Sequence, residues 1–309
     1  MNAGTIAAAV TAAVAVGAVA LVADGRPPSP TGGGCPAAGH VDPQVSGVEG
    51  GDIPTLPPAY SFSAVASDGC TPVRWNPCAP VRFVVNPAGA PPGGPEDVRE
   101  AFRRLGEATG ITYVDGGLTD ERSAGERAAY QPERYGRRWA PVLVEWRTEA
   151  GGTDEVQLVG VGLPVRSGDV YVSGRLSLNP AAVTSASART PLAPGFGSPG
   201  GTGPIGPSGV TWGRVVLHEL AHVAGLGHTR DRAQLMYPET TEQTTRPARF
   251  AAGDRAGLRH LGRDAGCLRT PPPGSPTTGP GGASPGRAWR RGPGRFRRRR
   301  SSPGGAGRA

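Results

Sequence analysis

The 309-residue sequence contains no lysine, and all 33 of its basic residues are arginine. Isoleucine is scarce while Ala, Gly and Pro abound, a bias typical of G+C-rich codons, so composition says little about partners. The sequence also lacks internal repeats. Gly and Pro crowd into residues 25–58, 87–95, 191–209 and 270–309, leaving a block with enough apolar residues for one core. This distribution excludes a collagen, a coiled coil and a polytopic membrane protein.

Acidic residues are absent after Asp264, whereas nine arginines lie between Arg287 and Arg308, so the formal net charge of +8 belongs to the tail. Residues 269–309 have no apolar period and are predicted to be disordered. The run Arg297–Arg300 would suit contact with an anionic polymer through counterion release. A solvated extension is the simpler interpretation of this tail.

The one long apolar run lies within residues 1–23 and is followed by a turn-rich, charged stretch. It is typical of an export segment, either a signal peptide with small residues at Ala18-Val19-Ala20 or a retained membrane anchor. We expect the rest of the chain to be secreted or extracytoplasmic, with membrane contact only if the segment is retained. Residues 24–60 are predicted to be a Pro/Gly-rich linker or pro-segment.

Four cysteines in an exported chain favour two disulfides. Pairing Cys78 with Cys267 would join the two ends of the apolar block, and pairing Cys70 with Cys78 would close a small loop. Cys35 could instead be a free thiol that masks a metal. The sequence does not choose among these arrangements.

The folded block is predicted over residues 61–268. Alternating or β-rich stretches predict strands, Pro95 opens a helix that ends at Gly110, and a Gly/Pro-rich loop precedes a second helix. The order strand, helix, four strands, helix, helix implies an α/β or α+β domain with one mixed, mostly parallel sheet of about five strands and three helices. The predicted strands are 81–85, 111–114, 141–146, 156–165 and 169–179, with a polar surface excursion over 115–138.

Residues 218–228 contain the pattern H-E-x-x-H-x-x-G-x-x-H. His218 and His222 are four apart, so on a helix both imidazoles project from one face and can share a cation. Gly225 can adopt a positive φ that ends the helix and brings His228 back as a third ligand. Three neutral nitrogens with an open fourth position are typical of catalytic zinc. Glu219 lies beside the first ligand, where it can serve as a base toward activated water.

This pattern, followed by Gln234–Pro238, resembles the metzincin zinc proteases and, within them, the matrixins. The resemblance implies an active-site helix plus a Met-turn, in which Met236 forms an apolar floor beneath one catalytic zinc. The stretch Gly253–Gly262 is similar to the final helix of that family. The string Arg74–Cys78 resembles the start of bacterial, particularly actinobacterial, matrixin-like proteins.

The resemblance also implies where substrate binds. An extended peptide would pair with an edge strand within Gln157–Pro164, and Tyr237, Pro238 and Thr240 would contribute to the pocket wall. Thr240 stands where the family usually has Tyr, so the family's preferences do not transfer. The sequence has no His between His40 and His218, so the second, structural zinc of animal matrixins is not expected, and calcium sites stay undetermined.

The sequence thus predicts a monomeric, zinc-dependent endopeptidase that acts on extracellular proteins or peptides, with Glu219 as general base. Two other classes stay open. One is a catalytically silent, zinc-stabilised binding module, and the other is a polyanion- or cell-wall-binding protein that uses the Arg-rich tail.

Overall fold

The structure is a computed structural model that describes residues 59–123, 127–148, 159–181, 192–197, 211–238 and 247–278. The predictions for residues 1–23 and 24–58, for Cys35, for Thr240 and for residues 279–309 fall outside these ranges and stay predictions. Within the described ranges, no helix has both the length and the apolar character needed to cross a membrane.

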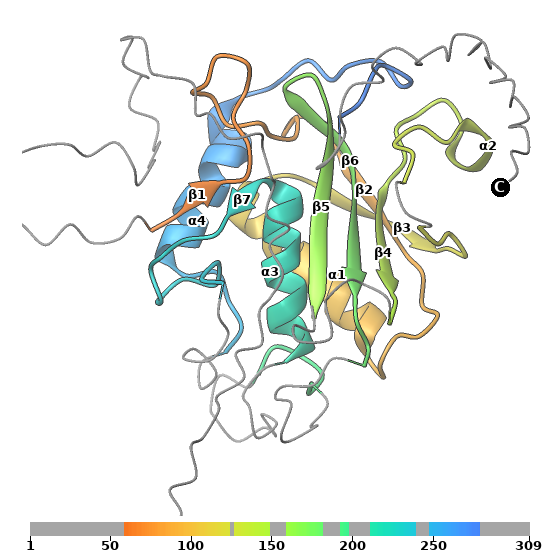
Figure 1. The fold of residues 1–309 in the computed structure, drawn as a ribbon, viewed down its shortest axis with the longest axis vertical. Coiled ribbons are helices and arrows are strands. Elements are labelled where there is room, and N and C mark those ends of the chain that lie inside the picture. Colours follow the sequence, from red (N-terminus) through yellow and green to blue (C-terminus); the bar gives the residue numbers. More distant parts are fainter. Residues whose placement is uncertain are drawn as a thin grey trace, which may run out of the picture.

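A five-stranded mixed sheet forms the centre of the fold (Figure 1). The strand order is β3-β2-β4-β6-β5; the first four strands are parallel, and β5 runs antiparallel to β6. The predicted mostly parallel sheet of about five strands is therefore confirmed. The strands are β2 (Val81–Val85), β3 (Tyr113–Leu118), β4 (Val142–Trp146), β5 (Gly160–Ser167) and β6 (Val170–Leu178).

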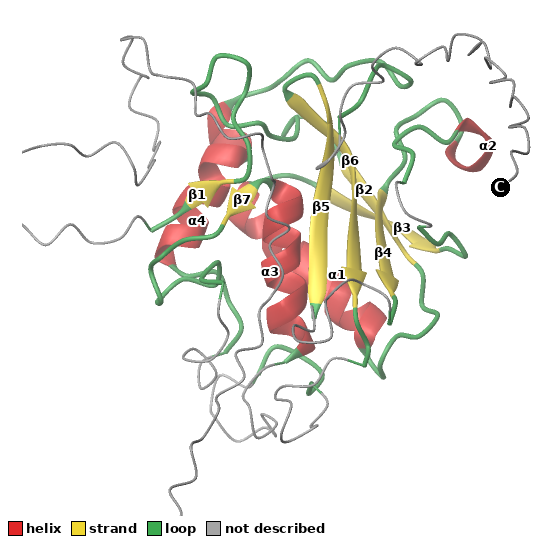
Figure 2. Cartoon of the chain, viewed as in Figure 1, coloured by secondary structure: helices red, strands yellow, loops and turns green. Residues whose placement is uncertain are grey.

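Three longer helices pack with the sheet around one core, and α3 lies between α4 and β5 (Figures 1 and 2). These are α1 (Gly94–Thr109), α3 (Trp212–Ala224) and α4 (Ala252–Leu261), as the sequence predicts, with a 3-10 turn at Arg263–Ala265. The helix α2 (Pro132–Tyr135) is a single turn that the sequence analysis missed, because one turn is too short to show an apolar period.

The apolar face predicted for α1 is the face that it buries. Val98, Phe102 and Leu105 are fully buried, and the Phe102 ring stacks on Phe83 of β2 with 3.8 Å between ring centroids. This contact joins helix to sheet because both patterns, every third or fourth residue in α1 and every second in β2, point into the same core.

Two segments near the expected limits of the domain belong to the folded structure. At one end, β1 (Ser61–Phe62) pairs antiparallel with β7 (Leu226–Gly227). At the other end, residues 270–278 lie along the sheet, where Thr278 bridges to Arg166 of β5. The expectation of disorder from residue 269 onward is therefore wrong for these residues. Backbone hydrogen bonds to β5 order a stretch whose composition gives no apolar period.

A disulfide between Cys78 and Cys267 joins the two ends of the fold across a sequence separation of 189. Cys70 is also in a disulfide, so the small loop between Cys70 and Cys78 does not form. Closing so long a loop restricts the unfolded chain and stabilises a domain by roughly 5 kcal/mol in the chain-entropy model.

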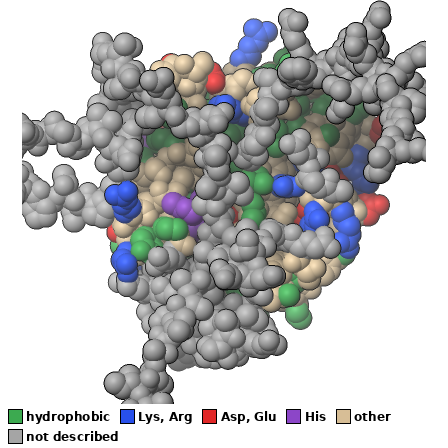
Figure 3. All heavy atoms as spheres, viewed as in Figure 1, with side chains coloured by type: hydrophobic (Ala, Val, Ile, Leu, Met, Phe, Trp, Pro, Cys, Tyr) green, Lys and Arg blue, Asp and Glu red, His purple; other side chains and the backbone are tan. Residues whose placement is uncertain are grey.

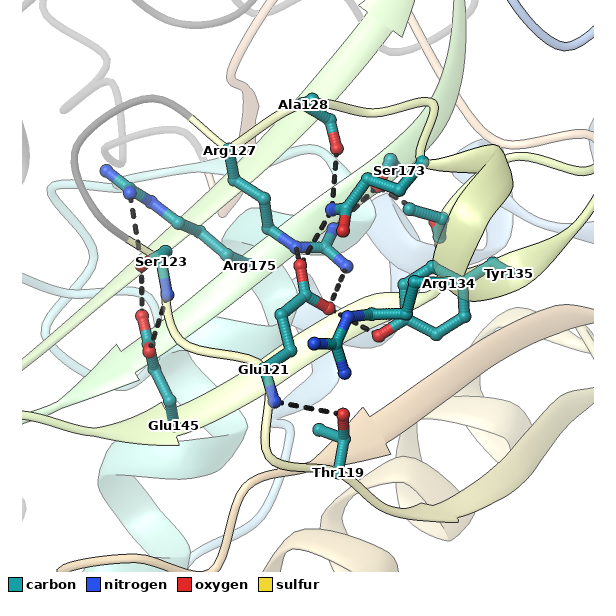
Figure 4. Close-up of polar contacts among 12 residues, drawn as sticks. Thr119, Glu121, Ser123, Arg127, Ala128, Arg134, Tyr135, Glu145, Ser173 and Arg175 are labelled. Atoms are coloured by element: carbon teal, nitrogen blue, oxygen red, sulfur yellow. Dashed lines mark hydrogen bonds and ion pairs between the residues drawn. The ribbon is translucent and has the colours of Figure 1, made fainter.

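The stretch between β3 and β4 lies at the surface, as its polar residues suggest, but a few of its side chains, among them Glu121, are buried against the sheet (Figure 4). Glu121 and Arg127 form a bidentate ion pair with N–O distances of 2.7 and 2.9 Å, and their side chains are only 7% and 4% exposed. Burial alone would raise the pKa of Glu121, but hydrogen bonds from Arg127, Tyr135 and Gln131 outweigh burial and lower that pKa.

The same arginine ties this stretch to the sheet, since its Nη1 donates to the Ser173 hydroxyl at 3.0 Å. A second buried carboxylate, Glu145 of β4, accepts the Ser123 N–H at 3.0 Å and the Ser177 hydroxyl at 3.2 Å (Figure 4). Charged groups can be buried here because nearly every oxygen has a donor.

We expect Arg127→Met to lower the free energy of unfolding by about 3 to 5 kcal/mol, because it leaves the buried Glu121 carboxylate without its cation. Urea denaturation measures the loss. Arg134→Met removes the exposed partner of Asp120 and is the matched control, expected to leave the unfolding midpoint nearly unchanged. Equal effects of the two variants would contradict a special role for the buried pair.

Candidate metal centre

The helix α3 runs through the middle of the molecule and carries the first two histidines of the motif. Its first turn is capped by the Thr211 hydroxyl, which accepts the Arg214 N–H at 3.3 Å. Gly225 ends it with φ 114°, as the motif predicts. A Cβ at Gly225 would lie 3.0 Å from the Tyr171 ring and 3.2 Å from the Val73 carbonyl oxygen, so both conformation and space favour glycine.

The turn after Gly225 brings the three predicted ligands together. Nε2 of His228 lies 3.2 Å from Nε2 of His218 and 3.2 Å from Nε2 of His222. Among the described residues, these three form the group of His, Cys, Asp or Glu side chains that could hold a metal ion. The rings therefore point toward one common position, as the helical spacing and the glycine turn indicated.

Two backbone carbonyls determine which nitrogen of each helix ligand is free. Nδ1 of His218 lies 2.9 Å from the Leu235 carbonyl oxygen, and Nδ1 of His222 lies 2.8 Å from that of Leu226. A carbonyl can only accept, so each Nδ1 carries the proton and donates it. The lone pair is then on Nε2, the atom that faces the other ligands.

The surroundings keep the imidazoles neutral. Burial is the main cause that lowers the pKa of His218 well below its usual value, and His222 and His228 lower it further. Burial also lowers the pKa of His222 to about 4 and lowers that of His228. Neutral rings are the form that binds a metal ion.

This donor set fits zinc. Nitrogen ligands at 2.0–2.1 Å in tetrahedral geometry are separated by about 3.3 Å from one another, close to the Nε2 separations of 3.2 Å. His222 and His228 are partly exposed, and histidine atoms are visible at the surface in Figure 3. Solvent can therefore approach the site from one side.

Glu219 is fully buried next to the first ligand and is held by β5. Its Oε2 accepts the Gly162 N–H at 2.7 Å, while Oε1 has no hydrogen-bond partner in the described part of the chain. Burial raises the pKa of Glu219 to about 8, partly offset by the Gly162 N–H. Helix and strand approach closely here, since a Cβ at Gly162 would lie 2.0 Å from the Glu219 carbonyl oxygen.

Met236 lies in a turn that is hydrogen-bonded to the histidine motif. Its side chain is fully buried, and its carbonyl oxygen accepts the Thr229 N–H at 3.0 Å, one residue beyond His228. The neighbouring Leu235 supplies the carbonyl that orients His218. The turn and the ligands are therefore linked through the backbone on both sides.

A reciprocal pair of side chains attaches this turn to α4. Asp254 accepts the N–H groups of Leu235 at 2.7 Å and Met236 at 3.2 Å, while Gln234 accepts those of Gly253 at 2.8 Å and Asp254 at 3.1 Å. Burial raises the pKa of Asp254 to about 6, although the three backbone N–H groups that it accepts act in the opposite direction.

The predicted pocket residues are only partly placed. Tyr237 and Pro238 follow the turn and are half-buried, and the Arg232 guanidinium lies 5.2 Å from the centre of the Tyr237 ring. Thr240 is outside the described residues. The predicted substrate strand is the edge strand β5, which begins at Gly160; its expected first residues, 157–158, are also outside the described ranges.

Fold and site together define a class: a mixed α/β domain in which a helix, a glycine turn and a buried methionine turn organise three histidines around one metal position. The sequence model of the family Matrixin matches residues 145–262, from the end of β4 to the end of α4. This part of the chain is a matrixin-like metzincin. The match supports a zinc metalloendopeptidase in general terms. No curated protein matches the chain.

Several residues that shape the site were not assigned a role from the sequence. Gly162 donates its backbone N–H, whereas Gln234 and Asp254 accept backbone N–H groups with their side-chain oxygens; such contacts have no spacing rule along the chain. Asp254 lies within Gly253–Gly262, the stretch that resembles the final helix of the family, so the resemblance carried a signal for it. For Gly162 the only signal was a glycine within a strand pattern, which often marks close backbone approach.

We expect Asp254→Asn to destabilise the protein by about 2 kcal/mol and to weaken metal retention. The amide has a single acceptor oxygen and cannot replace both carboxylate oxygens, so a buried N–H of the turn loses its partner. Urea denaturation and metal analysis after dialysis measure the two effects. Asp264→Asn, at an exposed position after α4, is the control; a matching result for both variants would argue against the role of Asp254.

Proposed function

We propose that this protein is a zinc-dependent endopeptidase that hydrolyses extracellular protein or peptide substrates. The observation that carries the proposal is the convergence of three imidazoles within the part of the chain that matches Matrixin: Nε2 of His228 lies 3.2 Å from Nε2 of His218 and 3.2 Å from Nε2 of His222. His218, His222 and His228 would hold the ion. Zinc at that position would supply Lewis-acid chemistry, acidifying water and polarising the scissile carbonyl.

Glu219 is proposed as the general base. Gly162 holds Oε2, which leaves Oε1 in a buried site without a competing donor among the described residues. A divalent cation beside the carboxylate favours its ionised form and opposes the effect of burial on its pKa. The carboxylate then accepts a proton from the attacking water and returns it to the leaving amine.

The outer edge of β5 from Gly160 to Pro164 is the proposed substrate platform, since Thr278 already pairs with the strand at Arg166. β5 is the last strand of the sheet order, and its Gly162 N–H is directed to Glu219 and not to the neighbouring strand β6. An extended peptide that adds to this edge would pass beside the proposed base. Main-chain pairing reads no side chains, so selectivity would come from the wall that begins with Tyr237 and Pro238.

Export of the protein, a monomeric state and contact of the Arg-rich tail with anionic polymers belong to the proposal as expectations from the sequence. A silent zinc-binding module is the competing function. The intact Glu219, whose Oε1 is unpaired among the residues that the structure describes, favours the enzyme, because a module that only binds zinc does not need a buried carboxylate at that position.

Glu219→Gln is expected to reduce peptide hydrolysis by about 10²-fold or more while the protein retains one zinc, because the amide cannot accept the proton of water. Hydrolysis of a peptide library and metal analysis of the same sample check both points. Glu133→Gln in α2 is the matched control and should keep full activity. Hydrolysis near the parent level in Glu219→Gln would remove Glu219 from the mechanism.

His222→Ala is expected to lose both zinc and activity, and chelation of the parent protein should inactivate it reversibly, because two remaining imidazoles hold the ion weakly. Metal content by mass spectrometry and recovery of hydrolysis on adding zinc are the measurements. His260→Ala, outside the triad, should keep its metal. Stoichiometric zinc in His222→Ala, or undiminished proteolysis in excess chelator, would refute the assignment.

A further inference from the structure

The first described residues of the chain lie directly against the turn that carries the third ligand. Ser61 pairs with Gly227 and Phe62 with Leu226, and the Ser63 N–H donates to the Gly225 carbonyl at 2.8 Å. Figure 1 shows β1 and β7 side by side near the end of α3. A segment more than 160 residues away in sequence therefore covers the backbone of the metal loop.

Two hydroxyls of this segment bind carbonyls that belong to the ligand shell. Ser61 Oγ donates to the carbonyl oxygen of His228 at 2.5 Å. Ser63 Oγ donates to the carbonyl oxygen of Leu226 at 2.6 Å. The Leu226 carbonyl is the same group that accepts Nδ1 of His222 at 2.8 Å. Ser61 thus holds the backbone of the ligand His228. Ser63 binds the same carbonyl that orients the ring of the ligand His222.

Glycines of α4 and β7 leave just enough room for this segment, because a side chain at these positions would collide with it. A Cβ at Gly253 would lie 2.3 Å from the Ala59 carbonyl oxygen, and one at Gly257 would lie 3.0 Å from the Tyr60 ring. A Cβ at Gly227 would lie 2.6 Å from Ser61 Oγ. The segment therefore packs directly against the backbone of α4 and β7. This close packing restricts where its hydroxyls can point.

We propose that Ser61 and Ser63 are positioning residues for the metal ligands His228 and His222. This inference rests on the proposed function, because it takes the three histidines as the zinc site. Hydrogen-bond partners behind metal ligands orient the rings, and their loss typically weakens metal affinity by about 10- to 100-fold. Residues 61–63 then form part of the support of the metal ligands. Cleavage of the chain beyond Ser63 would remove these two hydrogen bonds.

The test measures zinc affinity of the full chain by competition with a chromophoric chelator. Ser61→Ala/Ser63→Ala should bind zinc about 10- to 100-fold more weakly than the parent and should alter the visible spectrum of the cobalt-substituted protein, since the ligand rings are less constrained. Ser61→Thr/Ser63→Thr retains both hydroxyls and should keep affinity close to that of the parent. Ser67→Ala, whose hydroxyl binds Asp169 far along the sequence, is the control.

Zinc affinity within twofold of the parent and an unchanged cobalt spectrum in the double alanine variant would overturn the assignment. An equal loss in the threonine variant would also overturn it, because the effect would then come from strand packing and not from the hydroxyls. If the double variant does not fold, the single variant Ser63→Ala decides by the same criteria. A parent protein that binds no zinc at all would instead defeat the proposed function, on which this inference depends.

Discussion

The candidate site depends on the way in which two backbone carbonyls hold two imidazoles. The carbonyls of Leu226 and Leu235 accept the Nδ1 protons of His222 and His218, so both Nε2 lone pairs face the same position. Each carbonyl lies in a turn, one after the glycine that ends α3 and one before Met236. The metal position is therefore only as well defined as these two turns.

The surrounding structure holds these turns from several directions. Asp254 and Gln234 join the methionine turn to α4, while β1 pairs with the turn that follows α3. These partners bind backbone groups of the two turns. The contacts therefore tolerate changes in the side chains of the turns themselves. Such support suits a catalytic metal centre, where small displacements of a ligand weaken both binding and chemistry.

A buried ionisable group needs a partner of opposite charge to keep its charged form, and this holds both beside the sheet and at the metal site. Beside the sheet, Arg127 and the hydrogen bonds around Glu121 lower the pKa of this carboxyl and offset the cost of leaving water. In the site, Glu219 and the histidines have no fixed counterion among the residues described, and burial moves their pKa values toward the neutral forms. A divalent ion is the partner that this second set lacks, and it would favour the ionised carboxylate.

The sequence by itself determined the helix with two ligands one turn apart, the glycine that reverses the chain, the third histidine and the strand and helix order, because each depends on contacts between near neighbours. The limits were less secure: β3 begins at Tyr113 and not at Ile111, and the tail is ordered through Thr278. Only the tertiary structure decided that Gly162, Asp254, Ser61 and Ser63 support the site, that Cys78 pairs with Cys267, and that Glu121 and Arg127 form a buried ion pair beside the sheet. The contacts at the site and the disulfide join residues far apart in the chain, and the contacts at the site use backbone groups that every residue carries, so no local pattern marks them.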